Sequence, residues 1–548
     1  MKLFQQLLVA PAALGLLAPV AAHAADFDLS AVADYSPSKK EQVTSVTQFS
    51  DVYPTDWAYQ ALSNLVEQYG CVAGYPNGTF RGNRAMTRYE AAALLNACLD
   101  RITEITDELR RLMKEFETEL AILRGRVDGL EARVGELEAT QFSTTTKLKG
   151  KATFVMGATH AKGDNPKAGG YYGTDSKGNP LGLRRGYNSN YGAFTFSYDL
   201  RLGLKTSFTG KDLLFTRLRA GNMDNTPWEG QGVNLTKIDT GMDGDGQVVV
   251  DRLYYRFPLG SNFTVIAGPM LRNTEMMGYK PAVYGKGGQK LLDFFAVLGT
   301  PGVWSKETGS GFGAIYSNKS NVAKGDAYWT VAANYVADAG EGNNSNPQTG
   351  GFMTDNSRGN VTAQIAYGSK KWGVGAGYRY NQCRSAFRRG TEYAAANRWH
   401  IPCYNSDGER SGADANSWSF NAFWRPDDSG WIPSISAGVG QSYLHGDLNY
   451  NHPTTTSSWM VGLQWSDVFL MGNDLGIAVG QPTFVTATDD GTPDDGNYAM
   501  EAWYQFQVTD NIAITPGVFW LSRPYGELTP NDKSIGIFGG LVQTVFKF

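Results

Sequence analysis

Most of the chain, from Gln141 to Phe548, alternates apolar and polar residues in short runs between loops rich in Gly, Asn, Asp and Ser. A period of two is typical of β-strands, because successive side chains point to opposite faces of a sheet. In the clearest run, Phe194 to Phe208, aromatic and aliphatic residues share one face, while Thr, Ser, Asp, Arg and Lys share the other. A wall between lipid and a water-filled lumen requires these two faces.

Sixteen such segments are expected, near residues 146–159, 192–208, 211–223, 248–258, 261–270, 311–318, 327–337, 359–368, 371–381, 416–425, 431–443, 457–467, 474–482, 498–508, 511–520 and 535–548. An even number lets an antiparallel sheet close around an aqueous channel. The connections alternate between tight turns and long loops, and short turns typically face the periplasm. The sequence therefore predicts an all-β transmembrane barrel over residues 141–548, with about 16 antiparallel strands.

Two other patterns precede this region. From Leu99 to Glu138 apolar residues recur at steps of three and four, which predicts a coiled-coil stalk over residues 101–139 and therefore an oligomer. Residues 1–24 combine Lys2, an apolar stretch and a small-x-small site, the pattern of a cleaved signal peptide. After residue 25 no apolar window is long enough for a membrane helix, so a membrane-embedded chain is expected to be a barrel.

Composition and charge narrow the expected partners. The 548 residues include 65 glycines and only 19% charged residues, which does not suit one compact soluble core. A net charge of -4 provides no basic footprint, so nucleic acid is not an expected partner. The cysteines form two local pairs, Cys71 with Cys98 and Cys383 with Cys403, and an exported chain favours two disulfides over four free thiols.

Between a linker at 25–48 and the stalk, residues 49–100 have the spacing of a small α-rich unit. Four short motifs in this unit resemble those of an S-layer homology domain. They are Phe49-Ser50-Asp51-Val52, Trp57-Ala58, Gly74-Tyr75-Pro76-Asn77-Gly78-Thr79-Phe80 and Met86-Thr87-Arg88-Tyr89-Glu90. The resemblance implies binding to peptidoglycan-linked polysaccharide. Matching motif positions makes Asp51, Trp57 and Arg88 candidate contacts, although Trp57 is equally a core residue and Asp51 a helix cap.

The barrel region has a resemblance of its own. Two motifs resemble those of OprB-type porins: Ser143-Thr144-Thr145-Thr146-Lys147-Leu148 and Asn511-Ile512-Ala513-Ile514-Thr515-Pro516-Gly517. The aromatic residues Phe546 and Phe548 resemble the terminal signal for outer-membrane insertion. The whole arrangement resembles the S-layer-homology porins of cyanobacterial outer membranes. This implies a porin embedded in outer-membrane lipid that lets small hydrophilic solutes or ions, such as anions or sugars, diffuse passively. It also favours a homotrimer, with the N-terminal domain in the periplasm.

With the apolar faces toward lipid, the expected pore-lining residues are mostly basic. They are Asp199, Arg201, Lys205, Arg217, Arg219, Arg252 and Arg256. A row of guanidinium groups lowers the electrostatic cost for anions and can hydrogen-bond sugars or phosphates. The alternative is that these arginines pair with wall carboxylates such as Asp199 and Asp251, or with an inserted loop.

The connection from Leu271 to Ser310 follows the fifth strand, the position of the inward-folding loop in general porins, and is the candidate constriction loop. It carries Arg272, Glu275, Lys280, Lys286, Lys290 and Asp293. An ordinary surface loop is the alternative. The loop between Cys383 and Cys403, with Arg384, Arg388 and Arg389, is expected to be an outer lid.

Other functions fit less well. No cofactor is expected: the aspartates at 243–246 and 489–495 could bind calcium in loops, but they lack the spacing of a dedicated site. An outer-membrane enzyme is disfavoured, because His160, His400, His445 and His452 form no catalytic or metal motif. The serious alternative to a porin is a structural tether, in which a closed or nearly closed barrel anchors the outer membrane to the cell wall.

Overall fold

The computed structural model describes residues 43–56, 59–72, 74, 75, 77–82, 84, 85, 88–99, 114, 145–167, 171–285, 290–383, 388–395, 407, 411–427, 430–446 and 452–548. The chain divides into two compact units, Met1–Leu137 and Glu138–Phe548. The predicted signal peptide and, apart from Lys114, the predicted coiled coil lie outside the described residues. Among the described helices, none combines the length and apolar character needed to cross a membrane.

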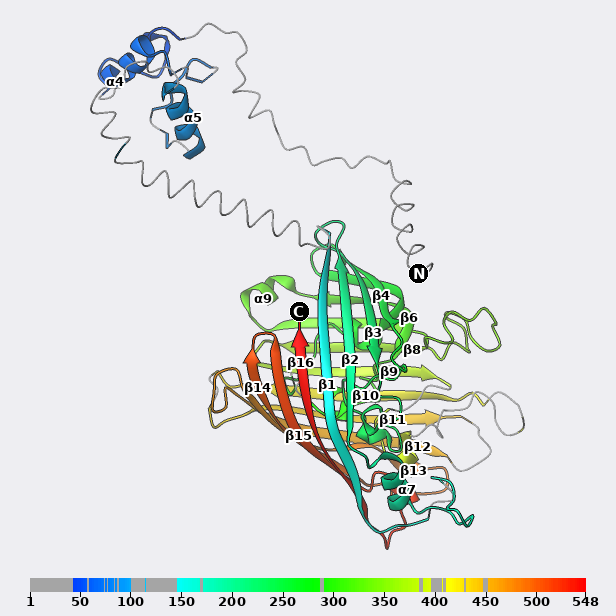
Figure 1. Cartoon of the computed structure of the whole chain (residues 1–548). Coiled ribbons are helices and arrows are strands. Elements are labelled where there is room, and N and C mark those ends of the chain that lie inside the picture. The colour runs from blue at the N-terminus through cyan, green and yellow to red at the C-terminus, as the bar shows by residue number, and fades with distance from the viewer. Residues whose placement is uncertain are drawn as a thin grey trace, which may run out of the picture. The chain divides into compact units, whose positions relative to one another are not determined.

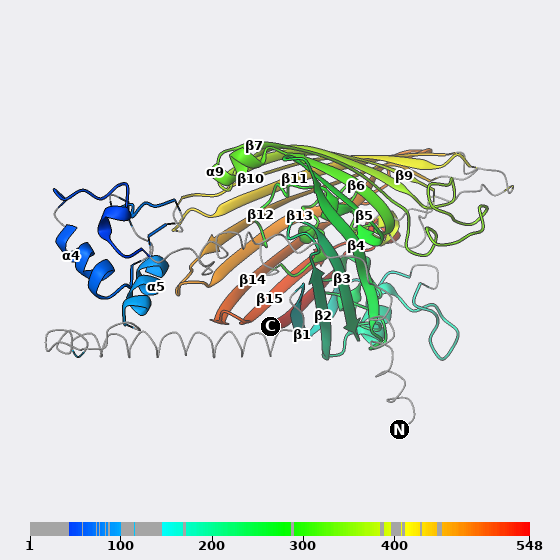
Figure 2. The same ribbon diagram turned by 90° about the horizontal axis from the view of Figure 1, so that it is seen from above.

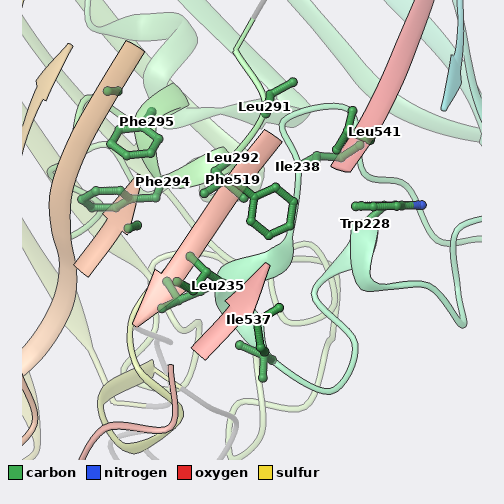
Figure 3. Packing of buried hydrophobic residues seen from close by; sticks show 14 of the residues in the cluster. Trp228, Leu235, Ile238, Leu291, Leu292, Phe294, Phe295, Phe519, Ile537 and Leu541 are labelled. Atoms are coloured by element: carbon green, nitrogen blue, oxygen red, sulfur yellow. The ribbon is translucent and has the colours of Figure 1, made fainter. Parts of the chain in front are cut away.

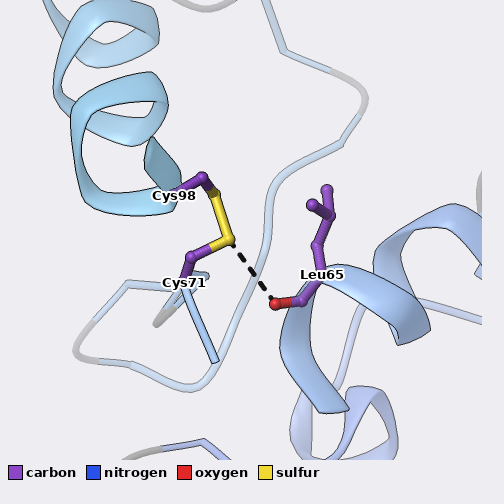
Figure 4. Close-up of a disulfide and its surroundings, with 3 residues drawn as sticks. All are labelled: Leu65, Cys71 and Cys98. Atoms are coloured by element: carbon purple, nitrogen blue, oxygen red, sulfur yellow. Dashed lines mark hydrogen bonds between the residues drawn. A yellow bond between two sulfur atoms is a disulfide. The ribbon is translucent and has the colours of Figure 1, made fainter. Parts of the chain in front are cut away.

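The described residues of the N-terminal unit include four helical elements: η1 (Val46–Gln48), α4 (Tyr59–Ser63), η2 (Asn64–Gln68) and α5 (Arg88–Leu99). Its core consists of Val46, Phe49, Leu62, Val66, Cys71, Val72 and Cys98. A disulfide joins Cys71 to Cys98, and the Cys71 sulfur lies 3.6 Å from the Leu65 carbonyl oxygen (Figure 4). So small a core buries little apolar surface, and the disulfide therefore carries much of its stability.

The second unit is a closed barrel in which each strand pairs antiparallel with its sequence neighbours and β1 pairs with β16 (Figure 1). The sixteen-stranded fold predicted from the sequence is confirmed. Its strands are β1 (Thr146–Gly163), β2 (Thr195–Thr206), β3 (Leu213–Gly221), β4 (Val249–Leu259), β5 (Phe263–Arg272), β6 (Thr308–Ser317), β7 (Tyr328–Val336), β8 (Asn360–Gly368), β9 (Trp372–Gln382), β10 (Asp414–Trp424), β11 (Ser434–His445), β12 (Pro453–Ser466), β13 (Asp474–Thr488), β14 (Tyr498–Thr509), β15 (Ile512–Ser522) and β16 (Ile535–Lys547).

Along the strands, buried and exposed residues alternate. In β10 the exposed side chains include Trp418 and Phe420, while Ser417 and Ser419 between them are buried. The exposed face is apolar and the enclosed face is polar, which is the arrangement of a barrel wall in lipid. The strands are long and steeply inclined, so that Figure 2 shows them sweeping obliquely around the lumen.

The two ends of the barrel differ. The connections β2–β3, β4–β5, β8–β9 and β14–β15 are short, and both barrel termini, Thr146 and Lys547, lie at this end. We call it the short-turn end. The opposite connections are long, and several contain helices, among them α7 (Leu183–Tyr191) and α10 (Glu392–Ala395). By the usual asymmetry of outer-membrane barrels, the short-turn end is periplasmic.

Replacing Cys71 and Cys98 together by Ser should destabilise the N-terminal unit selectively. The disulfide spans 27 residues, for which the chain-entropy model gives about 3.5 kcal/mol of stabilisation. In the full-length protein, urea-dependent proteolysis of the N-terminal unit should shift to lower urea while the barrel stays folded. Unchanged proteolysis would show that the core is sufficient without the disulfide. A Cys383→Ser, Cys403→Ser double variant is the matched control.

Candidate functional site

We call the connection between β5 and β6 the constriction segment; its described residues, 273–285 and 290–307, lie inside the barrel. Its backbone is hydrogen-bonded to inward-facing side chains of distant strands. Gln364 on β8 donates to the Tyr279 carbonyl (2.9 Å), Ser436 on β11 accepts from the Val283 amide (3.0 Å), and Glu501 on β14 accepts from the Leu292 amide (2.7 Å). A segment that touches β8, β11 and β14 of one closed barrel must cross its lumen.

Two further segments enter the lumen. Residues 222–248, between β3 and β4, contain η3 (Pro227–Glu229) and η4 (Asn234–Thr236). Residues 388–395, between β9 and β10, bond to the first of these segments, because the Arg389 amide donates to Asn234 Oδ1 (2.8 Å). Glu392 accepts from the Asn234 amide (2.6 Å) and from Tyr171 (2.5 Å). The residues around Arg389, expected to form an outer lid, are therefore built into the barrel interior.

One part of the lumen is filled by apolar side chains. Figure 3 shows Leu291, Leu292, Phe294 and Phe295 of the constriction segment meeting Trp228, Leu235 and Ile238 of segment 222–248 and Phe519, Ile537 and Leu541 of the wall. All ten are 5% exposed or less. Burial of this surface fixes the constriction segment against β15 and β16 and excludes water from that side. Any aqueous path must run through the remaining part.

The neighbouring wall, formed by β2, β3 and β4, carries a chain of alternating charges. Asp199 pairs with Arg201 (2.7 Å) and Arg219 (2.6 Å). Asp251 pairs with Arg217 (2.6 Å), and Glu275 of the constriction segment pairs with Arg252 (2.8 Å). In the strand register Arg201 stands opposite Arg219, and Arg217 opposite Arg252. Like charges in such positions repel, so the interleaved carboxylates are what allow four arginines to line one patch of wall.

A β-bulge makes this pattern possible. Arg217 is paired with Arg252 but the next residue, Leu218, is paired with Val250, so Asp251 is the extra residue in β4. A bulge rotates consecutive side chains toward the same face. Asp251 and Arg252 consequently both reach lumenal partners, although an unbroken strand would direct one of them to lipid.

A second ion-pair network ties the three inserted segments together. Lys306 of the constriction segment bonds to both Asp239 and Asp293, and Arg389 also bonds to Asp293. Burial alone would raise the pKa of Asp239, but Lys306 and Lys290 hold that pKa well below its usual range. Burial likewise opposes ionisation of Asp293, yet Arg389 and Lys306 keep its pKa below the usual value. Both carboxylates therefore remain charged, and the network holds the three segments in fixed positions relative to one another.

Between the two charged surfaces lies a cavity of about 350 Å³. Four basic side chains, Arg256, Lys280, Lys290 and Lys306, and two acidic ones, Asp239 and Glu275, border it. Lys290 and Lys306 are near carboxylates, whereas Arg256 and Lys280 are exposed and form no ion pair with any described carboxylate. Tyr279, also on the cavity, donates to the Ser369 carbonyl in the β8–β9 turn (3.1 Å), which places the cavity toward the short-turn end.

The sequence-predicted residues are thus distributed over several roles. Asp199, Arg217, Arg219 and Arg252 are wall ion pairs, as the alternative interpretation held, while Arg201 and Arg256 also face the lumen. Lys205 is exposed near the short-turn end of β2, and Arg272 donates to Thr308 (3.1 Å). Lys286 lies outside the described residues.

In the N-terminal unit, Asp51 has both carboxylate oxygens engaged by backbone amides, those of Phe80 (2.6 Å) and Arg81 (2.5 Å). Arg81 in turn lies over the Tyr75 ring, 4.4 Å from its centroid. Asp51 therefore positions the glycine-containing turn that carries these residues. Arg88 begins α5, and Trp57 lies outside the described residues. Cys383 is disulfide-bonded, and its predicted partner, Cys403, also lies outside them.

Sequence reasoning missed several important residues, namely Asp239, Lys306, Arg379, Glu307 and Glu501. Arg379 on β9 is 1% exposed and donates to Glu307 (3.4 Å) and to the Gly302 carbonyl (3.2 Å) of the constriction segment. One signal was available: residues 291–297 are almost entirely apolar although they belong to a loop. An apolar run in a connection between barrel strands indicates that the loop packs inside.

A closed sixteen-stranded barrel with an apolar exterior, inserted loops and a charged interior defines the class of outer-membrane porins. The chain matches the family model described as carbohydrate-selective porin, OprB family, over residues 105–548, and the S-layer homology domain model over residues 48–92. Since the first match covers most of its length, the chain belongs to the OprB family of porins.

The chain is also similar to individual proteins. An uncharacterised protein of Nostoc sp. is 35% identical, with 93% of this chain and 86% of that protein covered. The outer membrane protein SlpA of Deinococcus radiodurans is 37% identical over 119 residues, which cover 20% of this chain and 10% of SlpA. Among solved structures, OprB of Pseudomonas putida has a TM-score of 0.45 and 11% identity, covering 74% of this chain and 94% of that one. The protein is an outer-membrane β-barrel porin with a cell-wall-binding domain.

Replacing Glu501 by Ala should loosen the constriction segment. Glu501 accepts from Tyr284 (2.8 Å) and from the Leu292 amide (2.7 Å), and it is 2% exposed. Loss of two buried charged hydrogen bonds costs on the order of 3 kcal/mol. Single-channel recordings should show larger and noisier conductance than wild type. Asp532→Asn, an exposed outer-loop change, is the control, and equal conductance in both variants would contradict the anchoring role.

The contacts of segment 388–395 should weaken as the pH rises from 3.8 to about 7. Asp495 accepts from Thr391 (2.8 Å), and burial raises its pKa from 3.8 to about 7. A raised carboxyl pKa means that folding favours the protonated form, so this contribution is complete in acid and is lost as pH rises through about 7. Hydrogen exchange in 388–395, corrected for intrinsic rates, should increase across this range. In Asp495→Asn the corrected exchange should not depend on pH, and persistent dependence would implicate another group.

Proposed function

We propose that this porin is a narrow, anion-preferring diffusion channel for small hydrophilic solutes, and that it is a transporter and not an enzyme. The observation that supports this best is the charge bordering the cavity, four basic against two acidic side chains. In a confined aqueous path, net positive charge raises the local concentration of anions and excludes cations. The guanidinium groups also suit hydrogen bonding to the oxygens of sugars, phosphates and carboxylates.

The path runs between the arginine wall of β2–β4 and the constriction segment. Most wall arginines are neutralised by Asp199, Asp251 and Glu275, and their main role is to hold the wall rigid and polar. Arg256 is the main cation whose charge is left for the solute, since it is exposed at the cavity. Lys280 is also exposed there, but desolvation of its ammonium group and the nearby Lys290 lower its pKa, so its charge is the weaker contribution. Selectivity is thus assigned to these two residues more than to the full arginine row.

The S-layer homology domain is proposed to bind peptidoglycan-linked polysaccharide from the periplasm, with Asp51 acting by shaping the turn beside Arg81. The coiled coil at 101–139 is proposed to join three chains into a homotrimer. One specific observation favours the tether as a second candidate function: the apolar cluster removes part of the lumen from solvent access. If the remaining path is also closed, the barrel acts only as the membrane anchor of the wall link.

Replacing Arg256 and Lys280 together by Ser should reduce anion preference. A unit charge about 7 Å from a permeating ion contributes about 0.6 kcal/mol in water, favourable for an anion and unfavourable for a cation. Loss of two full charges would therefore lower the anion-to-cation permeability ratio by at most about 50-fold. Reversal potentials of the purified full-length protein in a planar bilayer under a salt gradient measure this ratio.

Lys167→Ser with Lys177→Ser is the charge-matched control, because both lysines are exposed in the long β1–β2 connection, at the end of the barrel away from the short turns. The control should retain the wild-type ratio. Equal ratios in all three proteins would refute the assignment of selectivity to Arg256 and Lys280. If wild-type barrels verified as folded conduct nothing, the transport proposal fails and the tether remains.

A further inference from the structure

Two neighbouring turns at the short-turn end expose large apolar side chains. They are Trp431 and Ile432 in the β10–β11 connection, and Phe469, Leu470 and Met471 in the β12–β13 connection. Trp431, Phe469 and Met471 are 98%, 90% and 92% exposed. The turns are adjacent, because β11 pairs with β12 and Trp465 on β12 donates to the Trp431 carbonyl (3.0 Å). We call these five residues the apolar turn patch.

The β12–β13 turn is held firmly in this arrangement. Asp467 Oδ1 accepts from the Gly472 amide (2.6 Å), the Asn473 amide donates to the Leu470 carbonyl (3.1 Å), and Tyr504 donates to the Val468 carbonyl (2.8 Å). Phe469 has φ +63°, in the left-handed region that bulky residues rarely adopt. A simple connection would use glycine or a polar residue there, so the strained backbone is retained to project an apolar side chain.

The surroundings of the patch identify what covers it. The Phe469 ring lies 6.0 Å from Tyr504, which lies 4.5 Å from Phe506 on the outward face of β14. Phe506 is exposed on the same face as Met500, the face that alternates with buried Glu501 and Trp503. Through Phe469 and Tyr504 the patch is therefore connected to the lipid-facing surface of the barrel.

We propose that the apolar turn patch is a membrane wedge, which inserts into the acyl region of the periplasmic leaflet of the outer membrane. Other short turns carry exposed charges at their tips, namely Lys211, Lys370 with Lys371, and Asp510. The β2–β3 and β4–β5 turns each expose one large apolar side chain as well, Phe208 and Leu259, whereas the apolar turn patch gathers five. The β10–β13 sector is thus immersed more deeply than the sector around β2–β5. Aromatic residues are favoured at membrane interfaces, where they form a belt around the barrel. The wedge adds a second anchor on the periplasmic side of that belt, and only in the β10–β13 sector.

Lipid-borne quenchers test the wedge directly. In full-length protein reconstituted into phosphatidylcholine vesicles, a fluorophore is attached to Met471→Cys without reductant, so that native disulfides stay intact. The same fluorophore on Ile432→Cys reports the neighbouring turn, and Lys211→Cys is the control on a polar turn. Quenching by nitroxide-labelled lipid is compared with quenching by iodide present on both sides of the bilayer.

Both patch labels should be quenched several-fold more by the labelled lipid than the Lys211→Cys label, and several-fold less by iodide. Equal iodide quenching at all three positions would overturn the proposal, because the patch would then face water. Shielding of the patch labels from both quenchers would overturn it as well, and would assign the patch to a second copy of the chain or another protein. Neither result depends on whether the channel conducts anions.

Discussion

Every backbone amide and carbonyl inside a lipid bilayer needs a partner within the protein, because the hydrocarbon region contains no water. The pairing of β1 with β16 meets this requirement for the whole barrel. It runs from Lys151 opposite Lys547 to Gly163 opposite Ile535, and it leaves no free strand edge. The extreme C-terminal strand is therefore the closing element. Side-chain alternation, the separation of lipid from lumen and the enclosure of the loops all depend on this one seam.

Closure of sixteen strands creates a lumen wider than a selective pore requires, and the protein fills it with its own connections. Apolar burial fixes the constriction segment on one side, where Phe294 and Phe295 meet Phe519. Ion pairs fix it on the other, where Lys306, Asp239 and Asp293 join three segments. These two kinds of interaction have different consequences. The apolar contacts exclude water, whereas the charged ones keep a hydrated path open.

In the low-dielectric interior of the barrel, a row of wall arginines does not simply add positive charge to the pore. Four guanidinium groups gathered on neighbouring strands repel one another unless carboxylates lie between them, and the bulge at Asp251 supplies one such carboxylate. Most of these arginines therefore form ion pairs that stabilise the wall. In the proposed function, the charge that acts on a solute belongs to residues without an acid partner among the described residues, and for this reason selectivity is assigned to Arg256 and Lys280.

The sequence alone determined the features that depend on local periodicity. The alternation in the segment 194–208 placed Asp199 and Arg201 on the lumenal side, because successive side chains of a strand point to opposite faces. The same reasoning located all sixteen strands. The words around Asp51 and Gly78 likewise identified the wall-binding unit.

Only the tertiary structure decided which loops enter the barrel and which charges are neutralised. Glu501 meets the Leu292 amide across a separation of 209 residues, and Arg389 meets Asp293 across 96. Neither contact leaves a periodic trace in the sequence, because each depends on how the closed barrel brings distant strands to the same lumen. The face of the sheet on which a side chain lies is a local property of the strand. The partner of a charged side chain and the entry of a loop into the lumen are properties of the closed barrel.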